Sequence, residues 1–180
     1  KLIEKLELVN KSWKYTDRLR FDMDFIGLQN YFPVVVKHSP FIPYVNATEV
    51  KATTRKVPVT GINWEISPDG FYNVLKRYWK YGAVKEIIVT ESGAAFADKI
   101  INGQVADEQR MLYHQLYLNA LLQAKKDGIK IKGYMAWTLT DNFEWAEGYH
   151  ARFGLVHVDF KTQLRTVKQS GYWFRDFLNG

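Results

Sequence analysis

The sequence contains no cysteine, which excludes disulfide bonds and thiolate metal ligands within the chain. Its four histidines, His38, His114, His150 and His157, do not show the spacing of a metal site, so we expect no metal and no other cofactor. No apolar run approaches the ~18 residues of a membrane-spanning helix, and residues 1–10 lack a signal-peptide pattern. We therefore expect no membrane association and leave the compartment open, with the cytoplasm favoured.

The sequence also lacks a block of charge of one sign. Its 180 residues are 47% hydrophobic and 24% charged, which is typical of a soluble globular protein with one sizeable core. A net charge of +6 with 16% aromatic residues is compatible with nucleic-acid binding. The lysines and arginines are scattered, however, and the solvated faces of amphipathic helices account for them. We expect no nucleic-acid partner.

The clearest functional signal is residues 86–93, which read EIIVTESG. Ile87, Ile88 and Val89 form a short apolar run that is typical of a strand buried on both faces. The run ends at Glu91, where an ionised carboxylate costs free energy unless a charge or a reaction needs it. In a barrel of parallel strands, catalytic residues lie at this carboxyl end. The structural alternative is that Glu91 caps the strand or pairs with a nearby lysine.

Further strands and helices alternate with this one. Residues 25–28 predict a second buried strand, which ends in Gln29, Asn30 and Tyr31. A third strand is predicted over residues 129–137, a short one over 153–158, and long loops over 32–63 and 92–106. Three helices are predicted: one from the N-cap Ser67 and Pro68 to Gly82, one over 107–126 ended by Gly128, and one over 167–178. This alternation predicts an α/β fold with parallel strands and right-handed crossovers.

Aromatic and acidic residues follow the third strand. Trp137 ends it, and Glu144 and Trp145 lie in the loop 138–153. Carboxylates interleaved with tryptophans suit a sugar, because the ring C–H faces stack on indoles and the hydroxyls donate to carboxylates. The structural alternative is that both tryptophans belong to the core.

Four motifs together carry a family resemblance. They are DFIGLQNY (24–31), NWEISPDG (63–70), VTESG (89–93) and the long stretch from Gly133 to Phe160. In this order they resemble the C-terminal part of a glycoside hydrolase family 1 β-glycosidase, over about residues 22–178. The resemblance implies an α/β fold of about three βα units of a (β/α)8 TIM barrel, incomplete in this chain. Residues 1–180 would form one partial-barrel segment with a poorly defined lead-in over residues 1–20.

The resemblance also implies an activity and roles for seven residues. The activity is retaining hydrolysis of the O-glycosidic bonds of neutral β-D-glycosides, as in a β-glucosidase. Glu91 matches the catalytic nucleophile, and Tyr31 matches the tyrosine that orients it. The other five match residues around the substrate. Trp137 matches the platform under the sugar, Glu144 matches the carboxylate that binds the O4 and O6 hydroxyls, and Trp145 matches its hydrogen-bonding neighbour. Phe153 matches a wall of the same sugar subsite, and Gln29 lies toward the aglycone.

The sequence departs from the family pattern in several ways. Ser92, Gln29, Tyr117 and Thr138 stand where Asn, Asn, His and Ser are usual, and the Asn-Glu-Pro motif that carries the acid/base glutamate does not occur. The mechanism needs two carboxylates about 5–5.5 Å apart. Of the other carboxylates, the resemblance assigns Glu144 to binding, and Glu65 precedes a helix.

The missing acid/base has consequences for activity and partners. We expect the chain alone to be inactive. We expect its partners to be a β-glycoside or oligosaccharide substrate and the N-terminal part of the same barrel, from one precursor or a second chain, unless it self-associates. The alternative is a non-catalytic barrel fragment that binds sugar or a partner chain.

Overall fold

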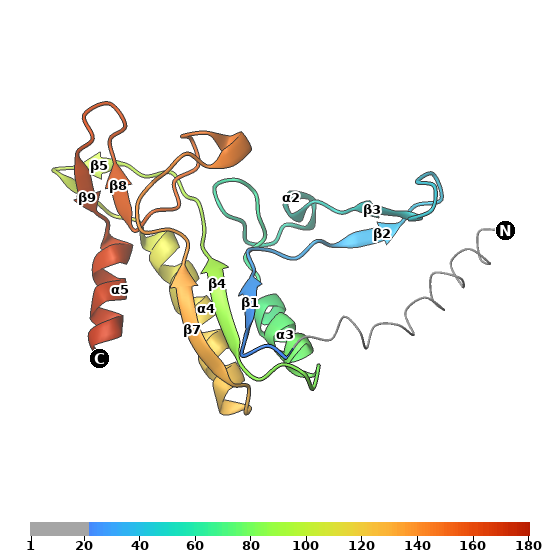
Figure 1. Cartoon of the computed structure of the whole chain (residues 1–180). Coiled ribbons are helices and arrows are strands. Elements are labelled where there is room, and N and C mark those ends of the chain that lie inside the picture. The colour runs from blue at the N-terminus through green and yellow to red at the C-terminus, as the bar shows by residue number, and fades with distance from the viewer. Residues whose placement is uncertain (1–21) are drawn as a thin grey trace.

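The fold is built on three parallel strands, and the computed structural model describes residues 22–180 of the chain (Figure 1). The lead-in expected over residues 1–20 lies outside the described residues. The sheet has the order β1 (Ile26–Gln29), β4 (Ile87–Ser92) and β7 (Ile131–Ala136), with both pairings parallel. This arrangement confirms the α/β class with a parallel sheet.

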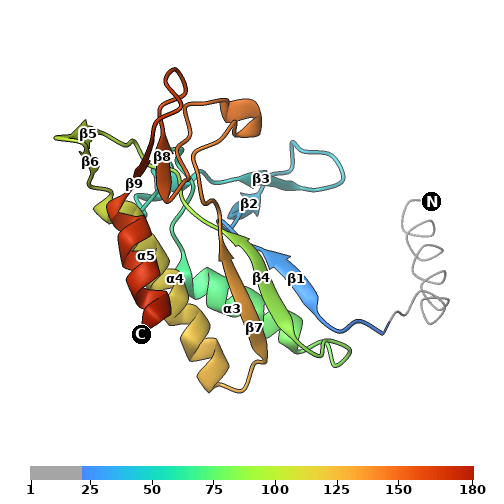
Figure 2. The same cartoon turned by 60° about the vertical axis from the view of Figure 1, so that its left-hand side comes forward.

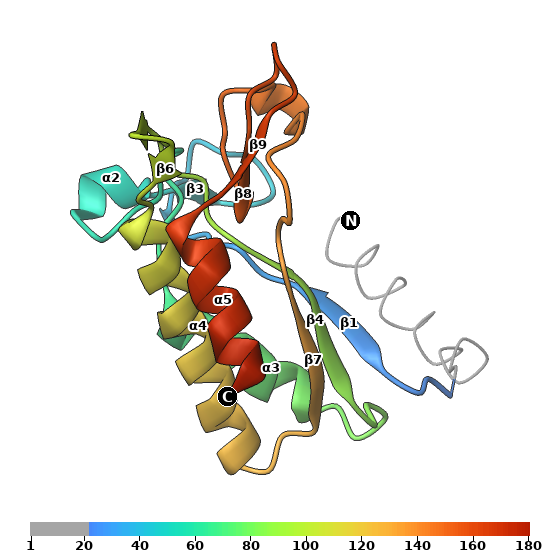
Figure 3. The same ribbon diagram turned by 90° about the vertical axis from the view of Figure 1, so that its left-hand side faces the viewer.

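Helices cover one face of this sheet. They are α3 (Pro68–Trp79), α4 (Glu108–Lys126) and α5 (Gln169–Asn179), and Figure 3 shows all three on the same side of the strands. The core lies in this interface and includes Leu28, Leu75, Ile87, Val89 and Tyr117. Burial of these apolar side chains stabilises the fold by about 1.5–3 kcal/mol for each large one.

The other face of the sheet is only partly covered. In β4, Ile87 and Val89 are fully buried, whereas Ile88 is only half-buried. In β1, Leu28 is the one buried residue, and the Phe25 side chain just before the strand is 49% exposed. The prediction that β4 is buried on both faces was therefore wrong for this chain, and the predicted burial of residues 25–28 holds only for Leu28. The physical reason is that, within residues 22–180, the helices pack on one face and β1 lies at an edge of the sheet.

Short elements interrupt the two segments predicted as loops. Residues 32–63 contain the antiparallel strands β2 (Val36–His38) and β3 (Ala47–Glu49), followed by α2 (Ala52–Arg55). Residues 92–106 contain the hairpin of β5 (Ile100–Ile101) and β6 (Gln104–Val105). Strands of two or three residues are too short to show a hydrophobic period, so the sequence did not predict them.

The C-terminal region adds the 3-10 helix η2 (Trp145–Glu147) and the antiparallel pair β8 (Val156–Val158) and β9 (Arg165–Val167). The strand predicted over residues 153–158 is confirmed for its last three residues, and the final helix begins two residues later than predicted. Within residues 22–180, no helix combines the length and hydropathy of a membrane span.

The helix boundaries test the capping predictions. The Ser67 hydroxyl accepts a hydrogen bond from Gly70 N at 3.2 Å, and Pro68 is the first residue of α3, as predicted. Gly128 follows α4 with a φ of +90°, the left-handed conformation that favours glycine. The prediction for Gly82 was wrong, because α3 ends at Trp79 and its C-cap is Lys80.

His114 on α4 gives the fold a testable pH dependence. Its ring is fully buried, and Nδ1 lies 3.2 Å from Tyr134 Oη. Burial, with a smaller contribution from the positive charge of Arg110, lowers the pKa of His114 from 6.5 to about 3. Between these two pKa values the unfolded chain binds more protons than the folded one. The contribution of His114 to the free energy of unfolding therefore increases as the pH rises and is lost as the pH falls.

We expect His114→Leu to flatten the dependence of the unfolding free energy on pH between about 3 and 6.5, because the leucine has no proton to bind when the chain unfolds. The measurement is urea unfolding at a series of pH values. His150→Gln, at an exposed position, is the control. A slope unchanged by the His114 substitution would contradict the assignment.

Candidate active site

A register shift in the sheet brings Glu91 and Gln29 together. Leu28 of β1 lies opposite Val89 of β4, but the next residue, Gln29, lies opposite Glu91, so Thr90 is passed over. Strict alternation would place Glu91 on the helix-covered face with Val89. With one extra residue in β4, Thr90 and Glu91 both remain half-buried and Ser92 is fully buried. Glu91 thereby avoids the apolar core.

Both carboxylate oxygens of Glu91 accept a hydrogen bond. Gln29 Nε2 donates to Oε1 at 2.7 Å, and Tyr31 Oη donates to Oε2 at 2.7 Å. Burial and the hydrogen bond to Glu91 raise the pKa of Tyr31 far above 10, so its hydroxyl keeps the proton that it donates. The structure therefore fixes one carboxylate at the carboxyl end of a central strand.

The neighbouring strand is held close by a glycine. The main chain after β7 approaches so closely that a Cβ on Gly93 would lie 1.8 Å from the Trp137 carbonyl oxygen. Only glycine fits this approach. Trp137 N also donates to Ser92 O at 2.9 Å. Figure 2 shows the three strands ending toward the same end of the molecule, where the loop after β7 lies.

Glu144 and Trp137 are joined directly in that loop. Trp137 Nε1 donates to Glu144 Oε2 at 3.1 Å, and Asn142 Nδ2 donates to the same oxygen at 3.3 Å. The Trp137 ring packs with Tyr31 against a buried cluster that contains Phe153. The indole of Trp137 is therefore half-buried, and its N–H is hydrogen-bonded to Glu144.

The seven residues predicted for the site differ in how closely they come together. Gln29, Tyr31 and Glu91 meet, and Trp137 and Phe153 border Tyr31 through the buried cluster that connects the two strand ends. Trp145 lies at the start of η2 and is 83% exposed. Gln29, which the resemblance placed toward the aglycone, donates to Glu91 in this structure. Its contact with substrate stays a prediction.

The sequence did not predict two features of the structure around Tyr31. Trp64 packs edge-on against Tyr31, with ring centroids 5.4 Å apart, and lies 5.8 Å from the Phe153 ring. Glu65, which the sequence placed just before a helix, is ion-paired with Arg55. The motif NWEISPDG drew attention to this segment, but nothing in it showed that Trp64 points toward Tyr31.

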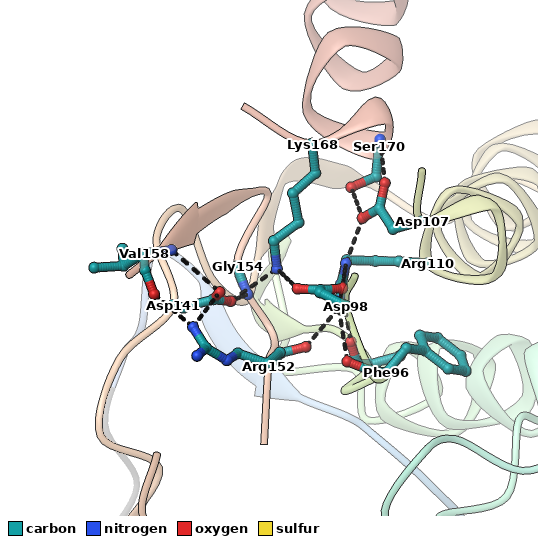
Figure 4. Close-up of polar contacts among 11 residues, drawn as sticks. Phe96, Asp98, Asp107, Arg110, Asp141, Arg152, Gly154, Val158, Lys168 and Ser170 are labelled. Carbon is teal, nitrogen blue, oxygen red and sulfur yellow. Dashed lines mark hydrogen bonds and ion pairs between the residues drawn. The ribbon is translucent and has the colours of Figure 1, made fainter. Parts of the chain in front are cut away.

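A buried ionic network anchors the loop that carries Glu144. Asp141 accepts hydrogen bonds from Arg152 Nη1 at 3.0 Å, Lys168 Nζ at 2.8 Å and Gly154 N at 2.9 Å. Lys168 also pairs with Asp98. Figure 4 shows these side chains converging from the loops after β4 and β7 and from the start of α5. Burial and the charge of Arg110 lower the pKa of Lys168.

Arg110 on α4 extends the network. It pairs with Asp98 and Asp107, and Arg110 Nη2 donates to the Arg152 carbonyl oxygen at 2.6 Å. Asp107 in turn accepts from Ser170 N at 2.8 Å, which joins α4 to α5. Three acidic and three basic side chains therefore balance one another in this network: Asp98, Asp107, Asp141, Arg110, Arg152 and Lys168. No group of three or more metal-ligating side chains occurs among the described residues.

Comparisons with known proteins match the chain to a protein family and to individual relatives. The family model described as "Glycosyl hydrolase family 1" matches residues 6–180. The chain is 40% identical over 163 residues to the 1,4-beta-D-glucan glucohydrolase of Thermotoga neapolitana, covering 90% of this chain and 36% of that protein. It is 42% identical over 153 residues to Beta-glucosidase A of Thermotoga maritima, covering 84% of this chain and 33% of the relative.

A solved structure agrees with the sequence matches. The family 1 b-glucosidase from Thermotoga maritima superposes with a TM-score of 0.82 at 41% identity, covering 87% of this chain and 35% of that chain. The chain thus spans about a third of the length of these relatives. It forms part of a TIM barrel, and the barrel is incomplete in it.

The ionic network gives a stability prediction. Asp141→Ala leaves Arg152 and the buried Lys168 without a shared partner, and breaking a buried pair costs about 3–5 kcal/mol of unfolding free energy. The control is Lys132→Ala, which removes an exposed pair with Glu86 at a cost of under about 1 kcal/mol. Urea unfolding measures both. Equal losses in the two variants would show that the network does not anchor the loop.

Proposed function

This chain belongs to glycosyl hydrolase family 1, and we propose that it supplies the nucleophile and the sugar-binding residues of a retaining β-glycosidase. The observation that carries the proposal is the position of Glu91. It lies at the carboxyl end of the central strand of a partial barrel, with one hydrogen-bond donor on each carboxylate oxygen. Catalytic residues of TIM-barrel enzymes lie at this end of the strands.

The reaction would be a double displacement. An oxygen of Glu91 bonds to the anomeric carbon while the glycosidic C–O bond breaks, and an acid from outside this chain protonates the leaving oxygen. The same partner group then takes a proton from water, which attacks the anomeric carbon and releases Glu91 with the configuration retained. Tyr31 and Gln29 hold the attacking carboxylate through their hydrogen bonds, so that little reorientation is needed.

The sugar would lie between Glu91 and the loop after β7. Trp137 would form its platform, and Glu144 would accept hydrogen bonds from the O4 and O6 hydroxyls, with Trp145 and Phe153 at the edges. The bond from Trp137 to Glu144 supports this reading, because it sets the platform and the carboxylate in one geometry. The negative charge of Glu144 repels a 6-phosphate, which favours neutral glycosides.

The remaining strands would have to come from outside this chain. In the part of the chain that the structure describes, β1 and β7 are the two edges of the sheet, and Phe25 just before β1 and Met135 in β7 are 49% and 55% exposed. Unpaired edges with apolar neighbours favour association with further strands. We therefore take the functional unit to be the complete barrel, meaning this chain with the strands that its relatives carry and it does not, supplied by the same polypeptide or by a second one.

The nucleophile assignment predicts a large loss of activity in that complete barrel. Glu91→Gln removes the attacking oxygen anion and should lower kcat for an aryl β-glucoside by several orders of magnitude. The matched control is Glu86→Gln, at the other end of the same strand. Trapping with a 2-deoxy-2-fluoro-β-glucoside should add one sugar to the tryptic peptide 86–99 of the parent protein, and none in the Glu91 variant. A loss in kcat of less than about tenfold would remove the nucleophile role.

The same proposal predicts that the isolated chain is inactive, since it lacks the acid/base. The strictest assay uses 2,4-dinitrophenyl β-glucoside, whose leaving group departs without a proton, so that the missing residue is needed only as the base that activates water for the second step. We expect no turnover above the buffer rate from the chain alone. If the chain alone turns over this substrate and Glu91→Gln abolishes that turnover, the prediction is contradicted. If the chain binds sugar without turnover, and Glu91→Gln does not change the binding, a non-catalytic binding module is favoured.

A further inference from the structure

The hydroxyl of Tyr117 lies at a junction between three segments. Tyr117 belongs to α4 and is fully buried. Its hydroxyl donates to the Tyr31 carbonyl oxygen at 3.3 Å and accepts from Ser67 N at 3.0 Å. A tyrosine hydroxyl has one donor and can accept as well, so both bonds form at once. One side chain thus joins α4, the start of α3 and the segment after β1.

The Tyr117 ring packs against two other aromatic rings. It stacks on Tyr113 with ring centroids 4.0 Å apart and an interplanar angle of 22°, and it packs against Phe71 at 5.3 Å. Burial is the main cause that raises its pKa, so the hydroxyl keeps its proton over the working range of an enzyme. Tyr113 Oη lies 3.2 Å from the hydroxyl of Ser92, the residue after Glu91. The two stacked tyrosines therefore contact Tyr31, which donates to Glu91, and Ser92, which follows Glu91 in the chain.

Tyr31 needs such an anchor because the sheet does not hold it. β1 ends at Gln29, and the ladder to β4 continues only as far as Asn30 N, which donates to Glu91 O at 3.1 Å. Tyr31 lies one residue further, where the chain leaves the sheet. Its hydroxyl nevertheless donates to Glu91 at 2.7 Å. The Tyr117 bond restrains the main chain of Tyr31 at this point.

We propose that Tyr117 is a positioning residue that holds Tyr31, and through it the Glu91 carboxylate, in the geometry needed for attack. The chain of contacts runs from Tyr117 Oη to the Tyr31 carbonyl and from Tyr31 Oη to Glu91 Oε2. Tyr117 itself touches neither the substrate nor the reacting atoms. This inference rests on the proposed function, in which Glu91 is the nucleophile.

The test is Tyr117→Phe in the complete barrel, which removes the hydroxyl and keeps the stacked ring. Loss of one hydrogen bond that aligns the reacting group should lower kcat about tenfold while KM changes less than about twofold. The rate of trapping by the 2-fluoro glucoside at saturation should fall by a similar factor. Amide hydrogen exchange at Tyr31, Phe32 and Ser67 should become faster.

The matched control is Tyr72→Phe. Tyr72 on α3 donates to Asp127 Oδ2, just after α4, at 2.5 Å, so it links the same two helices through a tyrosine hydroxyl. It makes no contact with Tyr31 among the bonds described. We expect this variant to lose thermal stability while kcat, KM and exchange at Tyr31 stay at parent values. A purely structural Tyr117 would give the same pattern as Tyr72.

Glu91→Gln measured in parallel separates the two proposals. If Glu91→Gln is inactive and Tyr117→Phe has the kcat of Tyr72→Phe, the positioning role is refuted and the nucleophile stands. If Glu91→Gln retains its activity, the proposed function fails. Hydrogen exchange then still tests whether Tyr117 holds Tyr31, because unchanged exchange at Tyr31 and Ser67 in Tyr117→Phe refutes that contact without reference to activity.

Discussion

Much of the candidate site depends on one irregularity in the pairing of β1 with β4. Gln29 lies opposite Glu91 because Thr90 has no partner of its own across the ladder. Without that extra residue, the side chain of Glu91 would point with Val89 into the apolar layer under the helices. There the carboxylate would lose hydration with no charge to compensate it. The bulge instead turns Glu91 toward the face where Gln29 and Tyr31 donate to it.

The sequence predicted the site in outline and not in detail, for reasons that particular residues show. Apolar runs that end in polar residues located the carboxyl ends of the strands, and the cap at Ser67 followed from local chemistry. The register shift that turns Glu91 away from the core was not predicted, because it depends on the pairing with the neighbouring strand. The partners of Asp141 were also invisible, since Arg152 and Lys168 lie far from it along the chain and meet it only through folding.

Two departures from the family pattern turn out to be neighbours in space. Ser92 and Tyr117 are two of the positions at which the resemblance implies a departure, and both contact Tyr113: the serine through its hydroxyl at 3.2 Å and the tyrosine by ring stacking. All three residues are buried, and protein interiors are close-packed, so a change of side-chain size at one position affects its neighbours. The sizes of the small Ser92 and the large Tyr117 are therefore coupled through their shared contact with Tyr113, next to the candidate nucleophile.

The spatial order of the parallel strands follows their order along the chain, β1, β4 and then β7. A ribosome therefore delivers each strand to the edge of the one before it, and no strand has to be inserted between two that are already paired. Gln29 and Tyr31 emerge first, Glu91 next, and the loop with Glu144 and Phe153 later. Both donors to the carboxylate therefore precede it along the chain, and the residues proposed to hold the sugar follow it, so the order of synthesis matches the order of the strands across the sheet.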